Sequence, residues 1–132
     1  MIKLVFCLHR LPTLSREQFQ DHWRHKHAPL VRELAPGLKI RRYVQSHCFY
    51  DEGLYAASKV RGGAAGYDGV AELYWDSLDD LYATATDPDA IKAGRKLLED
   101  ERKFIDLSCS PLFFTRENIV IAGGPEPSAE GL

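Results

Sequence analysis

Three histidines fall close together in the stretch FQDHWRHKHAPLV, which begins at Phe19. An imidazole titrates near neutral pH and can bind metal ions, so this stretch could form a metal site or supply an acid–base catalyst. At about 100° per residue, His27 continues an apolar stripe with Phe19 and Trp23, whereas His22 and His25 fall off the stripe and are expected to face solvent. No carboxylate or cysteine joins His22 and His25 as a third ligand, so no metal site is expected.

His27 is the strongest candidate for chemistry, because it lies at the inner end of the stripe, just before the helix break expected at Pro29. A buried histidine at this place could simply bond the free carbonyl groups of the last helical turn. The helix dipole favours the protonated ring and burial favours the neutral ring, so the sequence leaves the pKa of His27 open. In either state the imidazole could titrate near neutral pH, as a general acid or base must.

A second group of reactive side chains shares one face of a predicted strand. Because a strand has a period of two, Tyr43 and His47 lie on the same face as Arg41, Gln45 and Phe49. A phenol and an imidazole are thereby expected two positions apart along one wall, where they could hold a developing negative charge.

Two carboxylates, Asp68 and Glu72, share a face of the next predicted strand with Tyr74. A carboxylate among apolar neighbours is costly to bury unless it is paired. The partner could be an arginine of the preceding strand, or it could be His27, in which case the carboxylate would orient the imidazole.

The tryptophans and cysteines complete the set of candidates. Trp23 and Trp75 are expected in the core rather than stacked on a cofactor. The three cysteines are odd in number and widely separated, so neither a disulfide framework nor a CxxC metal or redox site is predicted. Cys48 remains of interest because it lies next to His47.

Four predicted strands and a set of helices must position these side chains. The strands are expected at residues 2–9, 38–50, 67–76 and 112–121. The first helix is expected to begin with a capping box of Ser15 and Gln18 and to run to about His27, followed by a short turn from Pro29. A second helical stretch, broken in two, is expected between residues 77 and 102. Residues 51–66 are expected to form a long loop, of the kind that often shapes a binding site.

The order β-α-β-β-α-β predicts a ferredoxin-like α+β domain with a four-stranded antiparallel sheet over residues 1–121, followed by a flexible tail at 122–132. Neither face of the predicted sheet is cleanly polar, although an antiparallel sheet normally leaves one face to solvent. The chain has no further element to cover that face, so a second copy of the protein is expected to do so in a symmetric homodimer.

Composition excludes several classes of partner. The chain has 132 residues and a net charge of −2, which argues against binding nucleic acid or an anionic membrane. No apolar run approaches the roughly 20 residues that span a bilayer. The N-terminal segment lacks the features of a secretion signal, so a cytoplasmic location is expected.

Four segments together resemble the EthD family of the dimeric α+β barrel superfamily. They are IKLVFCLHRLPTLSREQFQDHW from Ile2, HKHAPLV from His25, RRYVQSH from Arg41 and DGVAELYWDS from Asp68. The resemblance covers about residues 1–120 and implies a dimeric barrel with a small-molecule cavity between the sheet and helices of each protomer. It implies proton transfer on a cyclic or aromatic substrate, often with no metal or organic cofactor, with His27 and Tyr43 as catalytic residues. The long 51–66 segment departs from a minimal family member.

We therefore expect a metal-free and cofactor-free lyase or isomerase acting on a small aromatic, polyketide-like or lactone metabolite. The reaction would be a decarboxylation, a dehydration or a lactone or enol isomerisation. His27 would move the proton, and Tyr43 and His47 would hold the oxyanion. Candidates for contact with the substrate are Trp23, Cys48, Asp68, Glu72 and Trp75. The alternatives are a non-catalytic small-molecule-binding accessory protein of an oxidative pathway, and a haem protein with His27 or His47 as axial ligand.

Overall fold

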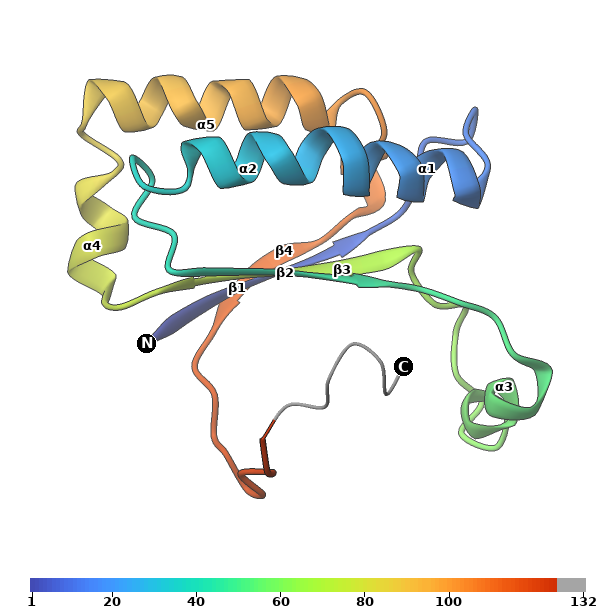
Figure 1. Ribbon diagram of the computed structural model, residues 1–132. Coiled ribbons are helices and arrows are strands. Elements are labelled where there is room, and N and C mark those ends of the chain that lie inside the picture. Colours follow the sequence, from blue (N-terminus) through green and yellow to red (C-terminus); the bar gives the residue numbers. More distant parts are fainter. Residues whose placement is uncertain (126–132) are drawn as a thin grey trace.

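The computed structural model describes residues 1–125, and in these the predicted four-stranded antiparallel sheet is confirmed. The strands β1 (Ile2–Leu8), β2 (Arg42–His47), β3 (Gly69–Trp75) and β4 (Leu112–Thr115) lie in the order β2-β3-β1-β4. The long helices cover one face of this sheet, and the other face carries no helix (Figure 1). This is the ferredoxin-like α+β arrangement expected from the order of the elements.

The first helical stretch is longer and more continuous than the sequence predicted. It consists of α1 (Arg16–His22), a π-helical turn (Trp23–His27) and α2 (Ala28–Leu34), with the capping box of Ser15 and Gln18 in place. The break expected before Pro29 is absent, because Ala28 keeps helical angles (φ −59°, ψ −45°) and its N–H bonds the carbonyl of Trp23, five residues back. The wide turn leaves room for a proline that has no N–H to donate, so the helix continues.

The expected 51–66 loop contains a helix, which corrects the prediction. Asp51 caps α3 (Glu52–Lys59) by accepting the backbone N–H of Leu54 at 3.0 Å. None of the residues of α3 is buried, and the helix lies apart from the rest of the molecule (Figure 1). Its short length and its alanines and glycine gave no clear period from which to recognise it.

The broken second helical stretch is confirmed as α4 (Leu78–Ala83) and α5 (Pro88–Glu101), followed by a 3₁₀ turn (Leu107–Cys109). Ser77 caps α4 by accepting the N–H of Asp80 at 3.1 Å. Of the two pieces, α5 packs beside α2 and the π-helical turn on the same side of the sheet, which places its last turn next to the first helical stretch (Figure 1).

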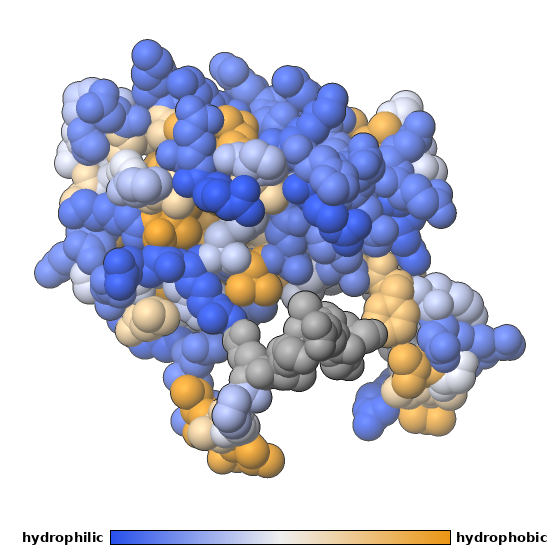
Figure 2. Space-filling view, in the orientation of Figure 1, coloured by the Kyte–Doolittle hydropathy of each residue, from blue (hydrophilic) through white to orange (hydrophobic). Residues whose placement is uncertain are grey.

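The last strand is shorter than predicted. It ends at Thr115, opposite Lys3, because β1 begins at Ile2 and offers no backbone for a longer edge strand to pair with. The apolar residues Ile119, Val120 and Ile121 are therefore left 70–88% exposed, and apolar side chains show on this projecting segment and on α3 (Figure 2). Of the predicted tail at 122–132, residues 126–132 lie outside the described part of the chain.

The core lies between the sheet and the helices. Its fully buried members include Leu8, Phe19, Trp23 and Phe104. No helix within residues 1–125 is long and apolar enough to cross a membrane.

Candidate functional site

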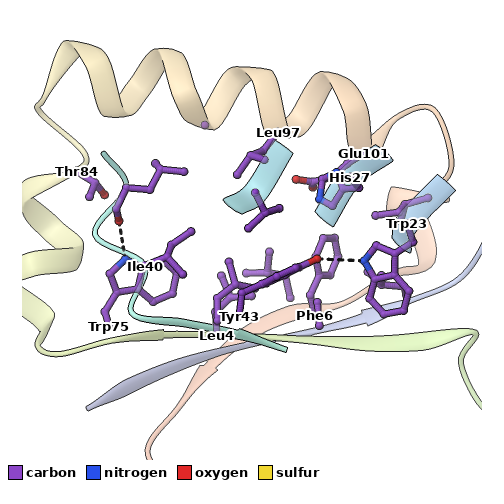
Figure 3. Close-up of a pocket in the computed structure, with 18 residues that line it drawn as sticks. Leu4, Phe6, Trp23, His27, Ile40, Tyr43, Trp75, Thr84, Leu97 and Glu101 are labelled. Atoms are coloured by element: carbon purple, nitrogen blue, oxygen red, sulfur yellow. Dashed lines mark hydrogen bonds between the residues drawn. The ribbon is translucent and has the colours of Figure 1, made fainter. Parts of the chain in front are cut away.

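A cavity of about 210 Å³ lies between the helix-covered face of the sheet and the helices above it. Its walls are mostly apolar and include Leu4 and Phe6 from the sheet and Leu97 from α5 (Figure 3). The space is smaller than the roughly 300–1,000 Å³ of a typical ligand pocket but larger than the ~150 Å³ apolar cavity that holds benzene. Its size therefore suits a ligand built on one small ring.

Three titratable side chains line this apolar space: the imidazole of His27, the carboxyl of Glu101 and the phenol of Tyr43. His27 and Glu101 lie side by side at the helical wall, and Tyr43 reaches in from the sheet (Figure 3). A few convergent polar groups in an apolar pocket are the usual marks of a ligand site.

His27 is held by a carboxylate from a neighbouring helix. Its Nδ1 lies 2.7 Å from Oδ2 of Asp100, and its side chain is only 7% exposed. Burial lowers the pKa of His27 below its usual value, and it outweighs the opposing effect of Asp100. At neutral pH the ring is therefore neutral, donates Nδ1–H to Asp100 and keeps the lone pair of Nε2 for a ligand.

Asp100 remains ionised in this place. Burial alone would raise the pKa of Asp100, but the hydrogen bonds from His27 and from His22 hold it below its usual value. A carboxylate that fixes the ring and stabilises its protonated form is what a catalytic histidine needs.

Glu101, the next residue along α5, is in a different protonation state. Burial, assisted by the nearby charge of Asp100, raises the pKa of Glu101 to about 7. Two adjacent carboxyl groups with pKa values pushed apart are a typical mark of acid and base roles. Near neutral pH a large share of Glu101 is protonated and able to donate a proton into the cavity.

Tyr43 is oriented by two donors. The indole N–H of Trp23 donates to its hydroxyl oxygen at 3.2 Å, and the side-chain amide of Gln45 donates at 3.0 Å. Gln45 also donates to the backbone carbonyl of Trp23 at 2.9 Å, which ties the π turn to β2. Because both lone pairs of the hydroxyl are occupied and burial raises the pKa of Tyr43, its proton is free to be donated to a ligand.

Of the residues singled out in the sequence, four line this cavity: Trp23, His27, Tyr43 and Trp75. The two tryptophans lie at opposite ends of the cavity (Figure 3). The indole N–H of Trp75 donates to the carbonyl of Leu38 at 2.9 Å, which fixes the ring at that end.

His47 lies behind Trp23 and does not line the cavity. Its ring centroid is 4.4 Å from that of Trp23, and its Nε2 is 2.9 Å from Oε1 of Gln45. Its Nδ1 is buried with no hydrogen-bond partner among residues 1–125. In this position His47 contacts the side chains that orient Tyr43, and it would act on a ligand only through them.

The structure does not bring Cys48, Asp68 or Glu72 to the cavity. Cys48 lines a separate hollow beside α3, of about 470 Å³. Asp68 forms ion pairs with Arg10 and Arg16 at 2.6 and 3.4 Å at the rim of the domain.

Glu72 faces the opposite side of the sheet, where it pairs with Lys3 at 2.7 Å. The carboxylate expected to orient His27 is therefore supplied by a helix, as Asp100, and not by a strand.

Sequence reasoning missed Asp100 and Glu101, although the pattern of α5 held a signal. Ala93 and Leu97 face inward at a spacing of four, and Glu101 continues that spacing as the one charged member. The prediction that His22 faces solvent is also wrong, because its side chain is only 19% exposed and contacts Asp100. His25 is 65% exposed, as predicted.

Within residues 1–125, no group of three or more histidine, cysteine, aspartate or glutamate side chains is placed to hold a metal ion.

The architecture defines a ferredoxin-like α+β protein with a small apolar cavity under its helices. The family model for the EthD domain matches residues 11–108, so the chain belongs to the EthD family. The resemblance seen in the sequence motifs is thereby confirmed. A comparison with curated protein sequences finds no significant match.

Solved structures share the fold at low sequence identity. An ethyl tert-butyl ether (EthD) family protein from Bacillus halodurans is 19% identical, with a TM-score of 0.58, over 89% of this chain and all of that one. A dimeric ferredoxin-like protein of unknown function from Bacteroides fragilis is 12% identical, with a TM-score of 0.55, over 88% and 95% of the two chains. HapK from Hahella chejuensis is 8% identical, with a TM-score of 0.58, over 97% and 100%. At these identities the likeness shows the fold alone.

Proposed function

We propose that the cavity is the active site of an acid–base enzyme, a lyase or an isomerase, that acts on a small cyclic metabolite with a carbonyl or enol group. One observation carries the proposal. A histidine held by a carboxylate, a carboxyl group with a pKa of about 7 and an oriented phenol line the same apolar cavity. These are the base, the acid and the oxyanion donor that an enolisation requires.

The proposed reaction begins with proton removal by His27. Its Nε2 takes a proton from the carbon beside the carbonyl, and the electron pair moves onto the carbonyl oxygen to give an enolate. Asp100 stabilises the imidazolium that forms, and the Tyr43 hydroxyl donates a hydrogen bond to the enolate oxygen.

The second step returns a proton at another position. Glu101 in its protonated form donates to a different carbon, which completes an isomerisation, or to a departing hydroxyl, which completes a dehydration. In the isomerisation His27 afterwards passes its proton to Glu101, directly or through the product, and both groups regain their starting states. A ligand between these mostly apolar walls contacts little water, which strengthens each of these electrostatic interactions.

The size of the cavity narrows the substrate. About 210 Å³ bounded by Trp23 and Trp75 accepts one ring with short substituents, in keeping with the aromatic or lactone metabolites that the family resemblance implies. A larger substrate would require the helices to move away from the sheet.

The test is deuterium incorporation from D₂O into a panel of small cyclic ketones, enones and unsaturated lactones, followed by mass spectrometry. The protein should accelerate exchange at the carbon beside the carbonyl for at least one compound. His27→Gln should reduce the rate about 100-fold or more, as expected for loss of a general base. His25→Gln is the matched control, because His25 lies two residues away and is largely exposed.

Tyr43→Phe tests the oxyanion role separately. Removing one donor to a developing oxyanion typically costs about 10²–10³ in kcat with less effect on KM. Unchanged turnover in His27→Gln would refute the proposed base. Tight binding of ring compounds with no chemical change in any of them would instead support a non-catalytic binding protein, and a Soret band with a haem-sized adduct in native mass spectrometry would support the haem alternative.

We also infer that a second copy of the chain covers the open face of the sheet. That face presents apolar side chains, among them Val5 and Val44, and the 46%-exposed Phe113, around the ion pair of Lys3 and Glu72. The similar protein from Bacteroides fragilis, and another ferredoxin-like protein of similar structure from Thermobifida fusca, are named as dimeric. Native mass spectrometry should show a dimer at micromolar concentration, and Phe113→Glu should shift it to a monomer. A monomeric unmodified protein would contradict the inference.

A further inference from the structure

A chain of three polar side chains leads away from the cavity on the far side of His27. Asp100 accepts a hydrogen bond from Nδ1 of His27 at 2.7 Å, and its two carboxylate oxygens lie 3.1 and 3.2 Å from Nε2 of His22. Exposure rises along this chain, with side-chain values of 7% for His27, 13% for Asp100 and 19% for His22. The sequence of contacts therefore runs from the cavity toward solvent.

The π turn makes this arrangement possible. Residues five apart on a straight α-helix differ by about 140° around the axis, so His22 and His27 would face different directions. The extra residue accommodated by the Trp23–His27 turn brings both rings to one carboxylate on α5. π turns of this kind occur frequently at functional sites.

The residues around Asp100 leave few other groups with which its carboxylate could exchange a proton. The ring of Phe104, which is fully buried, lies 4.7 Å from the ring of His22 and 5.1 Å from that of His27, and closes the apolar side of the group. The only cation besides the histidines that pairs with Asp100 in the described part of the chain is Lys103, at 3.9 Å and on the solvent side.

We propose that Asp100 and His22 form a proton pathway between His27 and solvent that is separate from the cavity. This rests on the proposed role of His27 as a base. His22 enters the relay as the tautomer with its proton on Nδ1, which the neutral ring reaches by exchanging protons with water. When Nε2 of His27 then accepts a proton from the substrate, the proton on Nδ1 of His27 passes to Asp100, Nε2 of His22 takes it up, and Nδ1 of His22 releases one proton to water. The carboxylate of Asp100 has the same charge before and after.

The pathway also works in the opposite direction. As Nε2 of His27 passes its proton to Glu101, a proton from solvent enters at Nδ1 of His22 and another returns through Asp100 to Nδ1 of His27, which restores both starting tautomers. His22 is thus a positioning and relay residue rather than a catalytic one, because it touches no reacting atom. It would let the enzyme exchange protons with solvent while a ligand fills the cavity.

The test measures exchange of the Nδ1 proton of His27 with water in the ¹⁵N-histidine-labelled protein by NMR, without any substrate. His22→Gln keeps an amide N–H for Asp100 but cannot take up and release a proton. Exchange at His27 should slow at least tenfold in His22→Gln and should stay unchanged in His25→Gln. A purely structural role for His22 would leave the rate unchanged, and that result would overturn the proposal.

A second measurement uses the unmodified protein, in case His22→Gln fails to fold. Xenon under pressure enters apolar cavities and would fill the space beside Nε2 of His27. The exchange rate of the Nδ1 proton should not change when xenon is bound, because the proposed route avoids the cavity. A marked slowing with xenon would place the exit through the cavity and overturn the pathway.

These outcomes are separable from the fate of the proposed enzyme activity. If exchange is unaffected by His22→Gln while His27→Gln abolishes turnover, only the relay fails. If no substrate is turned over but the relay variant slows exchange, the pathway stands and the reaction must be reconsidered.

Discussion

Glu101 allows a direct measurement of the free energy that it costs to hold an ionised carboxyl group in the cavity. Its carboxyl group faces apolar walls beside the charge of Asp100, and its pKa is raised from 4.5 to about 7. Replacing it by glutamine keeps the shape of the side chain and removes the ionisation. We therefore expect Glu101→Gln to stabilise the folded protein at high pH, although the residue is proposed to be essential for activity.

The sign and size follow from linkage between protonation and folding. Between pH 4.5 and about 7, folded Glu101 binds more protons than unfolded Glu101, so its contribution to stability is present below pH 4.5 and is lost as the pH rises through 7. Raising the pKa of Glu101 from 4.5 to about 7 sets an upper limit of about 3.5 kcal/mol, since each pKa unit corresponds to roughly 1.4 kcal/mol. Because the side chain is partly exposed, we expect Glu101→Gln to gain about 1–3 kcal/mol at pH 8.5 and little at pH 4.

The assay is urea unfolding at pH 4, 6 and 8.5, at one fixed protein concentration because association would alter apparent stability. The control is Glu99→Gln, an exposed residue on the same helix, which should shift stability by no more than ~0.5 kcal/mol at any of these pH values. Equal stability of Glu101→Gln and the unmodified protein at pH 8.5, or a loss at all three pH values, would refute the assigned environment of the carboxyl group.

Two further predictions concern the support of the site. Asp100→Asn should lower the pKa of His27 further, because the hydrogen bond and charge of Asp100 both raise it, and an NMR titration showing a rise would contradict the assigned contact. Gly69→Ala should cost about 1–3 kcal/mol of stability, since a Cβ at this position of β3 would clash with the ring of Trp23. Gly94→Ala is its control, because no atom lies within 4 Å of the added Cβ. This change should raise the stability of the folded protein by about 0.5–1 kcal/mol. Equal stability of the two variants in urea unfolding would count against the close packing of β3 on Trp23.

The elements of the fold could be predicted because their signals are local. The capping box of Ser15 and Gln18 marks where α1 begins, and short runs of apolar and aromatic residues mark β1 and β3. The end of β4 could not be predicted in the same way. Residues through Ile121 have the composition of a strand, but the strand stops at Thr115 because its partner β1 runs out. Pairing is decided by a segment more than a hundred residues away.

The candidate site was only partly visible in the sequence for a similar reason. His27 and Tyr43 stand out because each is a polar residue within an apolar pattern. Which carboxylate meets His27 depends on how α5 packs against the first helix, and the pattern of the predicted strand at 67–76 suggested Asp68 or Glu72 instead of Asp100. The burial of His22 depends in turn on the π turn, which shifts the direction of every residue before it relative to those after it.

The π turn has a consequence for how the helix tolerates changes in length. Phe19, Trp23, His27 and Val31 are all buried at a strict spacing of four, yet twelve residues of a regular α-helix would rotate the last about 120° away from the first. The wider π turn accommodates one extra residue and so removes about 100° of that rotation. The segment therefore has the geometry of a regular α-helix into which one residue has been inserted. Deleting one exposed residue between positions 23 and 27 should therefore restore an uninterrupted α-helix while both flanks keep their inward faces. A substitution in this turn tests the role of one side chain, whereas a one-residue deletion tests how the residues on the two sides of the turn are rotated relative to one another.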